Sequence, residues 1–447
     1  MKHHHYRFPA LLAAGIALFS LPVLRSSALE PRTWLSIDGR MIEAELIRQL
    51  GDSVELRDKD GRVLKVPRAQ LSFGDLDYVE ENAPADKTAA TLGGKPTTKP
   101  KLPNPAKEVK IDTKAFKKEA GDFKVNSRTY RVCETPHFKI LYMKPTDPID
   151  IGELAERLWI DTAFFHSTFI PKWVDRKMII LLVNDKEAYD DAGSWFADMI
   201  AETGTPEAKD AAGSLRKTWP QTAAGRIQLP QAQADEQKVF SEIRVFRAFR
   251  QQRTIDQNGK ITEGKPQPIK GVWVPFNTNV LSRDMLDIQA GGVGGATAEG
   301  AYAIFTGHAY YKEIQLNGKS ETSMLGTEGT GKDVKSTGGF QTDKSWAPEL
   351  KKMIKKEAEW EPAKNLDEVF AVKGDGATSR NVVYAYAFSR FLQSTPERLS
   401  AFNKLCQKID VANQVPELED IAKIYGYDDG AALKKAWIEW LSSGDFR

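Results

Sequence analysis

A region near the start of the chain alternates apolar and polar positions in short runs. Ile42, Ala44 and Leu46 are separated by polar residues, which is the pattern of a strand that buries one face. The sequence DKDG at 58–61 supplies a turn, and Ser72 is placed to cap a short final helix. Several short strands in so small a region predict a small all-β barrel.

A pattern of mixed periodicity begins near Phe123. The sequence YRVCETPHFKILYM at 130–143 predicts two strands around a Thr-Pro turn, and the apolar run Met178–Val183 predicts a buried strand. Asp185 is placed to start the next helix. Between these strands an apolar stripe predicts an amphipathic helix. The residues that share this helical face are Leu154, Leu158, Phe165 and Phe169.

Two Asn-Gly pairs and a long helical region complete the pattern. Asn258-Gly259 and Asn317-Gly318 each lie between strand-like stretches, so each predicts a hairpin. After Trp346 the apolar spacing is helical. The helices predicted there are Ala347–Glu359, Val382–Gln393, Glu397–Ile409, Leu418–Tyr425 and Ala431–Leu441. The region 122–447 is therefore predicted to be a larger α+β domain with a helical C-terminal part.

Residues 1–28 have the features of an export signal. A basic start precedes the apolar stretch Phe8–Leu24, and small residues end the segment at Ala28. No later segment approaches the roughly 20 consecutive apolar residues that span a bilayer. We expect an exported protein, periplasmic or extracellular, with no membrane span after cleavage of the signal peptide.

Residues 84–121 are rich in proline and lysine and have almost no apolar clusters. Such a composition buries too little surface to fold, and proline stiffens the chain. The sequence therefore predicts a linker between the β region at 30–83 and the domain at 122–447.

Charge and cysteine content exclude some classes of protein. The chain has 63 Lys and Arg against 61 Asp and Glu, a net charge of +2, so a dedicated nucleic-acid binder is not expected. Two cysteines are too few for a disulfide framework or a cysteine zinc ribbon. Whether Cys133 and Cys406 pair stays open, and so does the oligomeric state.

The β region resembles the Sla-homology domain, an SH3-like domain of endocytic adaptors that also occurs in exported proteins of planctomycete- and verrucomicrobium-like bacteria. The matching features are Arg32-Thr-Trp34, Asp38-Gly39-Arg40, Glu43-Ala44, Val66-Pro67 and Leu71-Ser72. The family is associated with protein, cytoskeletal and ubiquitin binding in eukaryotes. For an exported chain the resemblance implies a small protein-interaction module, with Trp34, Asp38 and Arg40 as binding residues. The alternative is a spacer, or a piece that docks on the chain's own large domain.

The large domain resembles gluzincin zinc peptidases of the peptidase-MA type. The resemblance rests on TPHFKILYM followed by a helix and MIILLVNDKEAYDD, on the Glu299-Gly300 segment, and on the helical C-terminal run. In that family HExxH holds zinc because two histidines four residues apart face one metal. The helix that would carry them falls near 277–287, where the sequence NTNVLSRDMLD contains no histidine. The resemblance therefore implies a degenerate relative that lacks the zinc site.

The remaining polar residues offer a second hypothesis. His308 with Tyr310, Tyr311 and Glu313 forms a polar and aromatic patch suited to acid–base work or to stacking on a ligand. If residues 298–313 form one helix, Glu299 and His308 lie on opposite faces, unless Gly307 breaks it.

Other motifs are weaker. Asp284 and Asp287 with Glu299 offer carboxylates to a hard cation, but isolated carboxylates are usually solvated, and no metal or cofactor is predicted. The sequence GTEGTGKD at 326–333 lacks the Ser or Thr of a phosphate-binding loop, so a mobile glycine loop is expected. His137 and His166 are expected to make packing contacts.

These observations favour an exported, non-catalytic protein-binding protein, with an SH3-like module joined to an inactive peptidase-like domain. A protein or peptide partner is expected, with Tyr310 and Tyr311 as further binding residues. The alternative is a hydrolase with a rearranged site around Glu299, His308 and Glu313. A structural surface protein is a third possibility.

Overall fold

The computed structural model describes the chain in several stretches. These are residues 30–36, 39–83, 109–173, 175–221, 224–250, 253–255, 261–263, 267–268, 274–292, 299–322, 343–355, 362–372, 379–443 and 446. The expected export signal at 1–28, the predicted binding residue Asp38 and the glycine-rich segment 326–333 lie outside the described residues.

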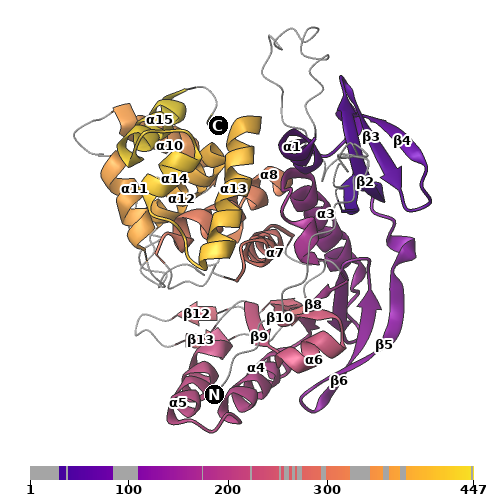
Figure 1. Cartoon of the computed structure of the whole chain (residues 1–447). Helices are drawn as coiled ribbons and strands as arrows, with labels where there is room; N and C mark the ends of the chain where they lie inside the picture. The colour runs from indigo at the N-terminus through magenta and orange to yellow at the C-terminus, as the bar shows by residue number, and fades with distance from the viewer. Residues whose placement is uncertain are drawn as a thin grey trace, which may run out of the picture.

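Residues 30–83, called the β module below, contain a four-stranded antiparallel sheet. Its strands are β1 (Arg32–Leu35), β2 (Met41–Leu50), β3 (Ser53–Asp58) and β4 (Val63–Pro67), in the order β1-β2-β3-β4 (Figure 1). A short 3-10 turn at Arg68–Gln70 and helix α1 (Phe73–Asn82) come next. A single bridge between Ser36 and Leu71 joins the end of β1 to the segment after β4. The predicted strands are therefore confirmed.

The core of the β module consists of alternate strand residues covered by α1. Trp34, Leu56 and Val79 are at most 1% exposed. Ser72 caps α1 as predicted, because its Oγ accepts a hydrogen bond from the backbone N–H of Asp75 at 3.0 Å. The Asp75 carboxylate turns instead toward β1, where it accepts a bond from the Leu35 N–H at 2.7 Å. The helix cap and the first strand are thus joined through one buried side chain.

The large domain, from residue 109 onward, is built on a six-stranded mixed sheet. In spatial order its strands are β5 (Lys117–Val125), β6 (Arg128–Glu134), β7 (Phe138–Tyr142), β8 (Lys177–Val183), β10 (Val239–Arg247) and β9 (Ala224–Gln228). Strand β8 runs parallel to both of its neighbours, and the other pairs are antiparallel. The buried strand predicted at Met178–Val183 is therefore a central strand of this sheet.

Helices cover both faces of the sheet. Helix α3 (Ile149–Phe165) packs on one face, where Ile140, Ile180 and Leu182 point. Helices α4 (Lys186–Ala201) and α5 (Pro206–Thr218) lie on the other side, and Asp185 caps α4 as predicted by accepting a bond from the Ala188 N–H at 2.7 Å. The apolar stripe predicted for α3 is buried, although Phe169 lies beyond the end of the helix.

The predicted linker ends earlier than residue 121. Strand β5 begins at Lys117, and Val109 and Phe116 are 6% and 7% exposed. Val109, Ile111 and Phe116 are the only large apolar residues at 109–117, too few for the periodicity to show that they pack against distant segments. The part of the predicted linker at 84–108 lies outside the described residues.

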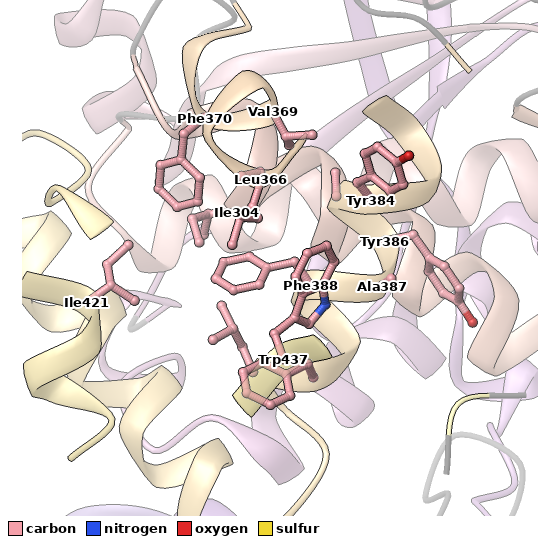
Figure 2. Packing of buried hydrophobic residues seen from close by; sticks show 14 of the residues in the cluster. Ile304, Leu366, Val369, Phe370, Tyr384, Tyr386, Ala387, Phe388, Ile421 and Trp437 are labelled. Carbon is pink, nitrogen blue, oxygen red and sulfur yellow. The ribbon is translucent and has the colours of Figure 1, made fainter. Parts of the chain in front are cut away.

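The helical C-terminal part is confirmed and packs against α7 (Val274–Gln289) and α8 (Gly307–Asn317). Its helices are α10 (Asp343–Lys355), α11 (Pro362–Ala371), α12 (Ser379–Leu392), α13 (Pro396–Ala412), α14 (Leu418–Ile424) and α15 (Gly430–Ser442). Figure 2 shows its aromatic centre, in which Phe388 of α12 meets Trp437 of α15 at 6.0 Å and nearly at right angles.

Of the two hairpins predicted at Asn-Gly pairs, one is present and the other is not. Short strands β12 (Arg253–Ile255) and β13 (Ile261–Glu263) pair antiparallel around Asn258-Gly259, which confirms that hairpin. The hairpin predicted at Asn317-Gly318 is wrong, because Gly318 ends α8 with φ of +72°. A glycine in the left-handed region serves both a hairpin turn and a helix end, so the dipeptide alone does not distinguish them. The remaining short elements are α6 (Gln231–Glu236), β11 (Phe249–Arg250) and β14 (Gln267–Pro268).

The β module packs directly on the large domain. Asp77 of α1 accepts hydrogen bonds from Ser167, Asn403 and Ser400, which come from segments far apart in sequence. Gly74 approaches the backbone so closely that a Cβ there would lie 2.8 Å from the Ser167 nitrogen. The structure thus favours the alternative in which this module docks on its own large domain. In the described part of the chain, no helix has the length and apolar character needed to cross a bilayer.

Candidate functional site

The residues predicted around His308 are not gathered into an open site. Glu299 is exposed at the turn before the helix, whereas His308, Tyr310 and Glu313 are buried in α8. The His308 ring stacks on Phe402 with 5.8 Å between centroids. Burial, and then the nearby Lys312 charge, lowers the pKa of His308 well below its usual value. A neutral, enclosed ring packed against phenylalanine is a core residue.

Glu313 holds together segments that surround α8. One carboxylate oxygen accepts bonds from the backbone N–H groups of Glu321 and Thr322 at 2.7 and 3.1 Å. The other accepts from Asn279 Nδ2 of α7 at 2.9 Å and from Ser320 Oγ at 3.0 Å. Burial raises the pKa of Glu313 to about 7, against the effect of these four donors. The four donors all come from elements other than α8, so Glu313 ties α8 to its surroundings.

Gly307 does not break the helix. Residues Tyr302–Thr306 form a π-helical turn that continues into α8, and Gly307 has an ordinary helical φ of −58°. A Cβ at this position would lie 2.3 Å from the carbonyl oxygen of Ala385 in α12. Glycine is therefore present because α8 and α12 cross with their backbones almost in contact.

The two predicted tyrosines also lie within the packing of the domain. Tyr310 is fully buried, and its ring meets the edge of Trp346 at 5.8 Å. Tyr311 is partly buried and packs against the C-terminal core, and burial raises its pKa. Neither offers the open aromatic surface that a ligand-stacking residue needs.

Helix α7 includes residues 277–287, where the sequence contains no histidine. Its Asp284 accepts bonds from Arg226 at 2.8 Å and from Arg244 at 2.6 Å, and Asp287 lies 3.3 Å from Arg226. Although burial alone raises the pKa of Asp284, the two arginines outweigh it and lower the pKa overall. These carboxylates serve ion pairs rather than a cation site. The described residues contain no cluster of three or more His, Cys, Asp or Glu suited to a metal ion.

The residues predicted for binding in the β module have different surroundings. Trp34 is 1% exposed, and its Nε1 donates to the Ala44 carbonyl at 2.8 Å, so it belongs to the module's core. The structure therefore places Trp34 inside the module and not at its open surface. Arg40 is exposed next to β2. Cys133 and Cys406 are both free and buried, in separate cores.

A hollow of about 530 Å³, called the interdomain cleft below, lies between the β module and the large domain. The module contributes Thr33, Met41 and Glu43 to its lining. The large domain contributes Glu134, Pro136, His137, Lys139, Trp159, Ile170, Trp173, Asp175, Arg176, Lys177, Gln237 and Lys238. Because the β module docks as a unit, residues more than two hundred positions apart share one cavity.

His137 is held in this cleft by a buried carboxylate. Its Nδ1 lies 2.7 Å from Glu156 Oε2, and its backbone N–H donates to Glu156 Oε1 at 2.9 Å. Thr135 Oγ1 donates to the same Oε1 at 2.6 Å. The imidazole stacks on Trp159 with ring centroids 3.5 Å apart, and 16% of its side chain is exposed. Glu156 therefore fixes the orientation of His137 and leaves Nε2 as the ring nitrogen available to a ligand.

The sequence predicts a packing contact for His137 and does not reveal this cleft. The histidine belongs to the TPHF motif at 135–138, and the packing contact expected of it is present as the stack on Trp159. Glu156 lies 19 positions later on α3, and no spacing rule links a turn to the middle of the next helix. Comparison with protein-family models, with curated proteins and with solved structures gives no match for the chain.

Proposed function

We propose that the protein is a non-catalytic binding protein that holds an extended segment of a partner protein against its β module. The observation that carries this proposal is the interdomain cleft, which exists only because the β module and the large domain pack together. Concave sites between domains are common places for ligands.

A second hollow extends the surface across the module. It has a volume of about 520 Å³ and is lined by Ile42, Glu43, Asp58, Lys59, Asp60, Arg62 and Leu64. Glu43 lines both hollows, so they adjoin at the start of β2. Met41 and Ile42 are 43% and 37% exposed there, among few large apolar side chains exposed in the described residues. Apolar contacts flanked by charges suit an extended peptide better than a small apolar molecule.

The proposal includes two family resemblances, that of the β module to Sla-homology domains and that of the large domain to gluzincin peptidases. An SH3-like module is supported by the antiparallel order of β1 to β4 and by the Ser36–Leu71 bridge after the short 3-10 turn. A degenerate peptidase-like domain rests on its sequence motifs and on α7, which pairs with α8 and has no histidine. Export rests on the sequence of residues 1–28.

The hydrolase alternative rests on Glu299, His308 and Glu313. Its support is weaker, because His308 and Glu313 are buried and hydrogen-bonded to structural partners. Metal analysis of the purified protein separates the two proposals. Stoichiometric bound zinc that is lost on His308→Ala would favour the hydrolase.

Peptide display against the purified protein tests the binding proposal. Selected peptides are expected to bind the wild type and to lose at least about tenfold in affinity when Met41→Ser and Ile42→Ser are combined, because the apolar contact is removed. Val411→Ser is the matched control, since Val411 is 85% exposed on α13, away from the cleft lining. An equal loss of affinity in the Met41/Ile42 double variant and in Val411→Ser, or the absence of any selected peptide, would contradict the proposal.

A further inference from the structure

The large domain gives the interdomain cleft a wall of hydrogen-bond donors. Lys139, Lys177 and Lys238 line it, and the carboxylate in their midst is Glu134. Glu134 lies 3.8 Å from Lys139 and 3.4 Å from Lys177, so it is shared by two ammonium groups. Lys238 is exposed, and the described residues give it no ion-pair partner. Three ammonium groups against one carboxylate leave this wall with an excess of two positive charges.

The cleft has two further acidic residues besides Glu134. Glu43 belongs to β2 of the module, and Asp175 belongs to the loop before β8. Arg176 is already paired with Asp235 at 3.0 Å. The lysines therefore lie on the large-domain side of the cleft together with Glu134 and Asp175, and the module contributes Glu43 opposite them.

Two buried indoles add further donors. Trp159 and Trp173 line the cleft and are 2% and 4% exposed, and no described residue accepts a hydrogen bond from either Nε1. An unpaired buried donor is unfavourable, so both indoles store a hydrogen-bonding need next to the cleft. The large-domain side of the cleft thus carries these indole donors as well as the Asp175 carboxylate and His137 Nε2.

We infer that the lysine wall of the interdomain cleft binds a carboxylate of the partner, so that the segment recognised is an acidic peptide. This inference rests on the proposed function and names the chemistry of its ligand. A carboxylate of the ligand would pair with Lys238, which has no described ion-pair partner, and would share Lys139 and Lys177 with Glu134. Charge-assisted bonds of this kind are stronger than neutral ones. Glu43, on the opposite side, can accept hydrogen bonds from backbone N–H groups of the same extended peptide.

The test uses the purified full chain and fluorescein-labelled peptides in a polarisation assay. A peptide of alternating Glu and Ala is compared with the same peptide carrying Gln in place of Glu. The Glu peptide is expected to bind about tenfold more tightly, and added salt is expected to reduce the difference. Combining Lys139→Gln with Lys238→Gln is expected to abolish the preference, whereas Lys408→Gln, an exposed lysine on α13, leaves it unchanged.

Thermal unfolding of each variant checks that the fold is retained. Equal affinity for both peptides, or a preference that survives the loss of both lysines, would overturn the inference. If inorganic phosphate competes as well as the Glu peptide does, the wall is a site for free anions and the peptide assignment fails. If display-selected peptides still depend on Met41 and Ile42 while no Glu preference exists, only this inference fails. If no peptide binds, the proposed function fails with it.

Discussion

His166 gives the chain a defined sensitivity to acid. The ring is fully buried at the end of α3, where Nδ1 is 3.1 Å from Asn403 Oδ1. His308 meets its edge at 5.8 Å, and Lys312, which is paired with Asp161 at 2.6 Å, is the nearby charge. Burial, and then the Lys312 charge, lowers the pKa of His166 to about 3 from 6.5.

The sign of the effect comes from proton linkage. Below about pH 6.5 the unfolded chain takes up a proton at this histidine that the folded chain does not take up until about pH 3. The free energy of unfolding therefore falls as the pH falls, by about 1.4 kcal/mol for each pH unit below 6.5. At about pH 5 this one residue lowers the free energy of unfolding by about 2 kcal/mol relative to neutral pH. His308 acts in the same direction, while Glu313, whose pKa burial raises, acts in the opposite one.

Urea unfolding at a series of pH values measures the effect. His166→Gln removes one titrating group. Between about pH 6.5 and 4.5 its free energy of unfolding is therefore expected to fall less steeply with pH than that of the wild type, and the difference in slope corresponds to about one proton. Comparison with wild type cancels the contributions of His308 and Glu313. Phe402→Leu, in the same cluster but without a titrating group, is expected to shift stability equally at every pH. Parallel curves for His166→Gln and wild type would refute the reasoning.

Three other substitutions, one of them with a matched control, probe the packing and the buried polar contacts by urea unfolding at neutral pH. Gly307→Ala is expected to lower the free energy of unfolding by at least about 1–3 kcal/mol, because its Cβ would lie 2.3 Å from the Ala385 carbonyl oxygen. Gly213→Ala is the control: no atom lies within 4 Å of its Cβ, so it is expected to stabilise the protein by about 0.5–1 kcal/mol. A gain from both substitutions would contradict the close crossing of α8 and α12. Asp284→Asn is expected to cost about 3–5 kcal/mol because Arg244 and Arg226 lose the buried carboxylate that they share, although Arg226 keeps Asp287. A loss below about 1 kcal/mol would argue against the pairing. Glu313→Gln is expected to cost about 1–3 kcal/mol, since an amide NH₂ cannot accept from the donors around it, and an unchanged stability would show that those bonds are dispensable.

The elements that were predicted correctly have local causes. The apolar run Met178–Val183 can only be a buried strand or helix, and its length favours a strand. Ser72 and Asp185 cap helices through bonds to residues three positions later, so the pattern is contained in a few letters. The prediction at Asn317-Gly318 failed because a dipeptide that suits both a hairpin and a helix end is assigned only by how the neighbouring segments pack.

The candidate site was less predictable. His308 and Glu313 have the side chains of catalytic residues, but their burial depends on α7, α12 and α13 packing around α8. His137 gains its fixed orientation from Glu156 on another element. Neither fact has a periodic signature, because contacts across a core relate positions without a constant spacing.

Periodicity and capping act within a few residues, so the amino-acid sequence alone is enough for the alternating strands of the β module, the mixed strands and helices of the large domain and the helical C-terminal part. Which polar residues are buried, and where a cavity opens, depends on the folded chain. Asp77 and Ser400, which help to seat the β module, are 323 positions apart, so the walls of the cleft meet only after folding. Exposure and cavity shape arise from the packing of distant surfaces, whereas secondary structure arises from neighbours along the backbone.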